Sequence, residues 1–176
     1  MDKIQERISR AWKESKSWIT EFDGTPFQAI FPKVAMEILP HSFETLSKDS
    51  ANFRVSIYGG ESGGEPQFVG PETIQLNVAR LLKDEISGLD ANYTANLPGL
   101  DLDVHLIVHT VARDRVDLEL VWWSDQVFPD DTDHQAMFQT VMSYFIFLQD
   151  LFKAPKVYVG PESLEDPDED TPWVEL

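Results

Sequence analysis

The clearest pattern in the chain is an alternation between residues 101 and 124 in which every second side chain is apolar. Arg113-Asp114-Arg115 interrupts this series, which then resumes. A period of two is that of a strand with one buried face. The sequence therefore predicts an antiparallel hairpin with strands at 101–112 and 116–124. Its apolar face comprises Leu102, Val104, Leu106, Val108, Val116, Leu118, Leu120 and Trp122.

A turn at 113–115 sets the pairing of the two predicted strands. It places Val108 opposite Leu120, Leu106 opposite Trp122, and His109 opposite Glu119. Both strands then present their apolar residues to the same side. A carboxylate beside His109 would raise the pKa of its imidazole.

Three other segments, 2–21, 72–87 and 134–152, carry apolar residues at helical spacing. Segment 134–152 follows an acidic run, 130–133, which is favourable at the positive end of a helix dipole. It has two apolar stripes, which favours a central helix covered on two sides. Segment 27–39 is ambiguous: Pro32 argues against one unbroken helix, and an edge strand would tolerate it.

These elements predict the α+β class: a single two-layer domain with helices packed on an antiparallel sheet. A chain of 176 residues suits one domain with a core of its own. We place this domain at 1–160. Residues 161–176 carry seven acidic and no basic side chains, which predicts a flexible acidic tail.

Charge narrows the class of partner. The chain has 31 acidic and 14 basic residues, a net charge of −17. Such a field repels nucleic acids and anionic membranes and attracts a basic protein. The charged first residues lack the apolar segment of a secretory signal, and the longest apolar run, 144–148, is far too short for a membrane span. We therefore expect a cytoplasmic protein.

Catalytic motifs are weak in this sequence. Gly60-Glu61-Ser62-Gly63-Gly64 matches the G-x-S-x-G pattern of serine hydrolases, but 65–67 (Glu-Pro-Gln) is a poor helix start. Carboxylates on both sides of Ser62 would also disfavour an oxyanion. The absence of cysteine excludes thiolate nucleophiles and Cys-ligated metals. We predict a flexible loop and no catalytic residue.

No metal or cofactor is predicted either. His105 and His109 share one strand face, but their α-carbons would lie roughly 13 Å apart, too far to bind one ion. Asp103 with His105, or Glu119 with His109 across the hairpin, could each supply two ligands. A transition-metal site needs three or four ligands, and no third is visible.

The polar face of the hairpin is the candidate binding surface. Trp123 would lie on it beside His105, next to Ile107 and Val121, with acidic residues around this apolar island. The surface could bind a basic protein, or helix 2–21 could cover it. We slightly favour the helix, because it would leave fewer apolar side chains exposed. The candidate partner-binding residues are Asp101, Asp103, His105, His109, Asp117, Glu119 and Trp123.

The function favoured by these features is a non-enzymatic, acidic protein-interaction module. Secretion chaperones and toxin-immunity proteins share this general profile, although no motif assigns the chain to either class. One alternative is a small-molecule-binding or enzymatic domain with a pocket between the sheet and helix 134–152. Another is a structural subunit that forms a homodimer or larger homo-oligomer.

Overall fold

A computed structural model describes residues 3–19, 26–60, 64–129, 132–161 and 174–176. Two single 3-10 turns, η1 and η3, precede α2 and α3. In chain order the elements are α1 (Lys3–Ile19), β1 (Pro26–Ala35), η1 (Met36–Ile38), α2 (Leu39–Asp49), β2 (Ala51–Tyr58), β3 (Gln67–Val69), η3 (Pro71–Thr73), α3 (Ile74–Leu82), β4 (Gly88–Leu97), β5 (Leu100–Ala112), β6 (Arg115–Trp123), α4 (Ser124–Val127), α5 (His134–Phe152), β7 (Tyr158–Pro161) and β8 (Val174–Glu175).

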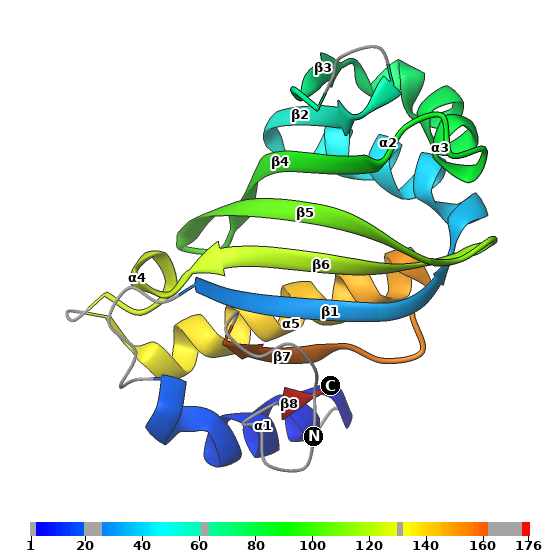
Figure 1. Ribbon diagram of the computed structural model, residues 1–176. Helices are drawn as coiled ribbons and strands as arrows, with labels where there is room; N and C mark the ends of the chain where they lie inside the picture. Colours follow the sequence, from blue (N-terminus) through cyan, green and yellow to red (C-terminus); the bar gives the residue numbers. More distant parts are fainter. Residues whose placement is uncertain (1–2, 20–25, 61–63, 130–131, 162–173) are drawn as a thin grey trace.

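The eight strands of the described residues form one antiparallel sheet in the order β3-β2-β4-β5-β6-β1-β7-β8. The predicted hairpin, β5 and β6, lies at its centre. Helices α2, α3 and α5 pack against one face of the sheet and form the second layer (Figure 1). The predicted fold class, a single α+β domain, is confirmed.

The core lies between the sheet and α5. The even-numbered residues of β5 and β6 from Leu102 to Trp122 that face α5 are buried, as the alternation predicts. The ring of Trp122 lies 4.8 Å from that of Phe145 on α5 and 5.9 Å from that of Phe27 on β1, measured between centroids. Asp133 begins α5 by accepting a hydrogen bond from the backbone N–H of Ala136 at 3.1 Å. Burial of each such large apolar side chain stabilises the fold by about 1.5–3 kcal/mol.

Helix α1 packs on α5 and β8 instead of covering the outer face of the sheet. The rings of Trp12 and Phe138 lie 5.2 Å apart, and Ile8 and Ala11 are buried on the same side of α1. The preference for helix 2–21 as a cover of the outer face is therefore wrong. The apolar stripe of α1 instead packs on α5 at Phe138, whereas Phe147 of α5 is 45% exposed, so the predicted cover on a second side of α5 is only partial.

Strand β1, which contains Pro32, is an inner strand of the sheet over part of its length only. It pairs with β6 on one side, and on the other β7 pairs with 27–30 alone. Among the described residues, no strand pairs with this side of β1 at Pro32, and the register with β6 shifts there, between Phe31 and Val34. A bulge of this kind accommodates the missing N–H of proline.

The hairpin register differs from the predicted one by two residues. Leu106 pairs with Leu120, and His109 pairs with Asp117. The cause is a tighter turn, because Ala112 pairs with Arg115, together with a bulge between Thr110 and Ala112. A shift of two leaves every side chain on its predicted face.

The last described residues, 174–176, pack on the domain that was predicted at 1–160. Val174 pairs with Val159 in β7, and the backbone N–H of Leu176 donates to the carbonyl of Val157 at 2.9 Å. Val174 and Leu176 are 4% and 3% exposed, so both belong to the core. The acidic residues at 162–173 lie outside the described residues.

Within the described ranges, no helix combines the length and the apolar character that crossing a membrane requires.

Candidate functional site

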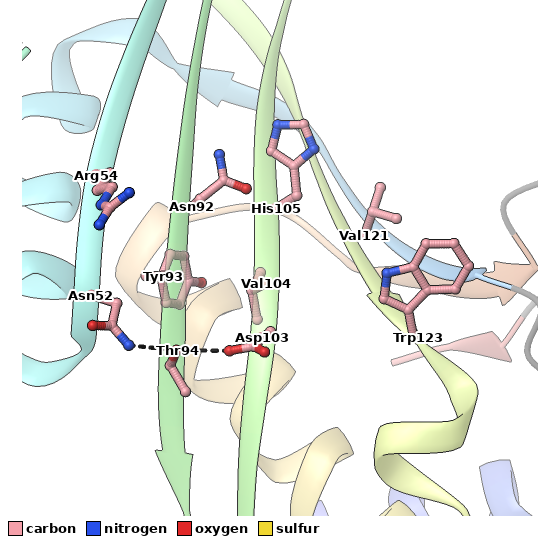
Figure 2. Close-up of a pocket in the computed structure, with 10 residues that line it drawn as sticks. All are labelled: Asn52, Arg54, Asn92, Tyr93, Thr94, Asp103, Val104, His105, Val121 and Trp123. Carbon is pink, nitrogen blue, oxygen red and sulfur yellow. Dashed lines mark hydrogen bonds between the residues drawn. The ribbon is translucent and has the colours of Figure 1, made fainter. Parts of the chain in front are cut away.

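The described helices leave the outer face of the sheet, opposite α5, uncovered. This face has a shallow hollow of about 630 Å³ over β2, β4, β5 and β6 (Figure 2). Strand alternation brings the outward side chains of four neighbouring strands together there. The hollow is lined by Asn52, Arg54, Asn92, Tyr93, Thr94, Asp103, Val104, His105, Val121 and Trp123.

Four of the predicted site residues lie at or beside this hollow. Asp101 and Asp103 on β5 are exposed, and Trp123 at the end of β6 is 51% exposed. Asp103 accepts a hydrogen bond from the Thr94 hydroxyl at 2.7 Å. The fourth residue, His105, lies opposite Val121 instead of Trp123, because of the corrected register. Figure 2 shows Trp123 on the Asp103 side of the hollow.

The other three predicted residues lie nearer the hairpin turn and are engaged within the chain. His109 Nε2 lies 2.6 Å from Glu119 Oε2, although the two residues are diagonal neighbours and not a direct pair. Asp117 accepts a hydrogen bond from the backbone N–H of Lys33 at 2.8 Å. The Glu119 carboxylate holds the pKa of His109 above its usual value, as predicted. These carboxylates are thus less available to a partner than Asp101 and Asp103.

Asp90 on β4 is a residue that the sequence analysis missed. Its carboxylate is buried, and Oδ2 lies 2.9 Å from His105 Nε2 and accepts a hydrogen bond from the Tyr58 hydroxyl at 2.6 Å. Burial raises the pKa of Asp90, but hydrogen bonds from His105, Tyr58 and Ser56 outweigh it and lower the pKa. The hydrogen bond that Tyr58 donates to Asp90 raises the pKa of Tyr58.

A sequence signal for Asp90 does exist. Leu89, Ala91, Tyr93 and Ala95 alternate with polar residues, which indicates a strand with Asp90 on its outer face. Its contact with His105 could not be predicted without knowing that β4 and β5 pair.

The outer side chains of the hollow form two cross-strand rows. Arg54 pairs with Asn92, Asn92 with His105, and His105 with Val121. In the next row Thr94 pairs with Asp103. The side-chain amide of Asn52 donates to the Thr94 hydroxyl at 3.4 Å. The first row carries hydrogen-bond donors, whereas the second ends in a carboxylate beside an exposed indole.

Other candidate sites receive less support. Among the described residues, no three His, Asp or Glu side chains converge in a way that could hold a metal ion. Ser62 lies outside the described residues. The side of α5 that faces the sheet is buried in the core, including Phe138, Phe145 and Phe152. The hollow lies on the opposite face from the pocket suggested between the sheet and helix 134–152.

Comparison with known proteins gives a fold likeness and no family. No protein-family model and no curated protein sequence matches this chain. A chain with a similar fold comes from the crystal structure of the toxic C-terminal tip of CdiA from Pseudomonas aeruginosa in complex with an immune protein. The alignment covers 82% of this chain and 90% of that chain, with a TM-score of 0.51 and 19% sequence identity. At this identity the likeness shows a shared fold.

Proposed function

We propose that the protein is an immunity-like interaction module that binds a basic protein through the outer face of its sheet. The single observation that carries this proposal is the hollow, left uncovered by the described helices, that Asp103 lines together with the exposed Trp123, with Asp101 two residues from Asp103 on the same face of β5. A half-exposed aromatic ring with a polar, charged rim is typical of the centre of a protein–protein interface.

Electrostatics supports a basic partner. The net charge of −17 attracts a cationic surface over several ångströms and speeds encounter. Asp101 and Asp103 are exposed on this face, so their carboxylates can also attract basic side chains of the partner at short range. A lysine or arginine of the partner could meet the Asp103 carboxylate and the face of Trp123 together, which combines ion pairing with a cation–π contact.

The fold likeness supports the class of function. The similar chain belongs to a complex of a toxin tip with an immune protein, so its fold occurs in a protein that binds another protein. We infer by analogy that this chain binds a toxin-like basic protein and neutralises it without catalysis. A cytoplasmic location and a homodimer remain predictions.

The test uses basic proteins encoded next to this protein's gene. Each is co-purified with the chain, and binding is measured by titration calorimetry at low and high salt. We expect one of them to bind, with an affinity that falls as salt rises. Binding that is indifferent to salt, or no binding by any of them, would contradict the proposal. Light scattering of the chain alone tests the homodimer.

A further inference from the structure

We propose that Arg54, Asn92 and His105 form a binding site for an oxyanion, either a carboxylate or a phosphate group. The apolar part of the ligand would extend over Val121 toward Trp123. This site is separate in chemistry from the proposed contact with a basic protein, because it recognises negative charge.

Geometry brings the three side chains within reach of one ligand group. They occupy one cross-strand row on β2, β4 and β5. Neighbouring strands lie about 4.8 Å apart, so the α-carbons of Arg54 and His105 are separated by about 10 Å with Asn92 between them. An arginine and an imidazole can span that gap from both ends. Figure 2 shows Arg54, Asn92 and His105 in a line along one side of the hollow.

Arg54 is the main determinant of this site. Its side chain is exposed, and within the described ranges no carboxylate pairs with it. By contrast, Arg80 lies 3.9 Å from Glu85, and Arg115 lies 3.8 Å from Asp114. A free guanidinium presents a planar set of donors that matches carboxylate and phosphate oxygens. In a chain with a net charge of −17, such a free cation in a hollow indicates an anionic ligand.

Asp90 orients His105 for the same task. The contact between Asp90 Oδ2 and His105 Nε2 places the Nε2 proton toward the carboxylate, which leaves Nδ1 to face a ligand. Nδ1 is an acceptor in the neutral ring and a donor only in the protonated ring, so His105 contributes to oxyanion binding in its protonated form. When His105 is protonated, its charge offsets that of the buried Asp90 carboxylate 2.9 Å away, which reduces the repulsion of an anion.

The second row sets the direction of the ligand. Asp103 repels an anionic group from its own row, so the oxyanion belongs beside Arg54 and His105. Val121 lies opposite His105 and offers an apolar contact. From Val121 an aromatic or aliphatic group of the ligand can reach the half-exposed ring of Trp123. The face of an aromatic ring is unfavourable for an anion but favourable for an apolar group.

The experiment is a titration of the full chain followed by amide and side-chain NMR. The probes are inorganic phosphate, acetate, phenyl phosphate and phenylacetate, with benzyl alcohol as the neutral comparison. We expect saturable shifts of Arg54, Asn92 and His105 with the anions. Phenyl phosphate or phenylacetate should bind about tenfold more tightly than its inorganic or methyl counterpart and should also shift the Trp123 indole. If the two phosphates bind more tightly than acetate and phenylacetate, the ligand group is a phosphate. The opposite order indicates a carboxylate.

Arg54→Gln is the decisive variant, and Arg113→Gln, on the exposed turn between β5 and β6, is its matched control. We expect Arg54→Gln to weaken anion binding at least about tenfold and Arg113→Gln to leave it unchanged. Equal binding by both variants would overturn the proposal. So would shifts that do not saturate, or shifts confined to arginines outside the hollow, such as Arg7 and Arg10 on α1. None of these results depends on the basic partner, so the two proposals fail separately.

Discussion

The carboxylate of Asp90 holds the imidazole of His105 at 2.9 Å, on the uncovered face of the sheet. The acid is buried, whereas the histidine side chain is 39% exposed and lines the hollow. The same carboxylate oxygen accepts the Tyr58 hydroxyl, so three strands meet at one polar cluster. This cluster fixes the orientation of His105, one of the side chains that line the hollow.

Replacing Asp90 by Asn should destabilise the protein. The hydroxyl of Tyr58 and the imidazole of His105 would lose a charged acceptor, which costs about 1–3 kcal/mol. Because the pKa of Asp90 is lowered in the folded state, this stabilisation is present above the ordinary carboxyl pKa of about 4 and is lost as pH falls through the lowered value. Urea unfolding at neutral and acidic pH measures it. Asp150→Asn, at an exposed position, is the control, and equal stability of the two variants would refute the account.

The contact of His109 with Glu119 should make stability depend on pH in the opposite sense. The pKa of His109 is raised in the folded state, so its contribution is fully present below the unfolded value of about 6.5 and is lost as pH rises through the folded value. Because His109 is half-exposed, we expect only a few tenths of a kcal/mol. Unfolding of Glu119→Gln should match wild type at high pH and fall below it at about pH 5, where imidazole groups are charged and carboxyl groups are still ionised. Glu37→Gln should show no such dependence; if it does, the assignment to His109 is wrong.

The hydroxyl groups of Tyr93 and Tyr144 form a hydrogen bond of 2.9 Å between β4 and α5. Tyr144→Phe should cost about 1–2 kcal/mol, because it leaves the buried Tyr93 hydroxyl without this partner. Replacing both by Phe should recover most of the loss, since no polar group is then left unpaired. Thermal unfolding of the two single variants and the double variant tests this prediction. If the loss of unfolding free energy in the double variant equals the sum of the losses in the two single variants, the two hydroxyl groups do not depend on each other.

A substitution at Leu176 tests whether the end of the chain contributes to the core of the domain. The side chain of Leu176 is 3% exposed, so Leu176→Ala should cost about 2 kcal/mol of unfolding free energy. Leu76→Ala is the matched control, because that leucine on α3 is 63% exposed and its truncation should be nearly neutral. If Leu176→Ala is equally neutral in urea unfolding, the end of the chain contributes nothing to the core.

The central hairpin could be predicted because its alternation extends over two long strands and fixes which side chains face α5. Its register could not, since the bulge near Val111 is a local backbone choice that the alternation does not encode. Strand β4 was missed although Leu89 and Tyr93 mark its inner face, because the intervening alanines give a weak apolar signal. Helix α2 was not predicted, because a proline disfavours a helix interior, whereas Pro40 lies in the first turn of this helix, where proline is tolerated.

Prediction of the candidate site was limited by strand order. Asp103, His105 and Trp123 were found because all three are on the hairpin, where one pairing fixes their neighbours. Arg54 and Asp90 come from strands that reach the site only through the pairing of β2 with β4 and β4 with β5. Long-range pairing of this kind depends on the packing of the whole sheet, which a single sequence does not reveal.

The affinity of site variants for the basic partner tests the central claim most directly. Titration calorimetry compares wild type with Trp123→Ala and with Asp101→Asn/Asp103→Asn. The control is Asp49→Asn/Asp150→Asn, which removes the same charge from exposed positions on α2 and α5. We predict that each site variant binds at least about tenfold more weakly, whereas the control stays within about twofold. Equal losses for site and control variants would contradict a binding surface on the outer face of the sheet.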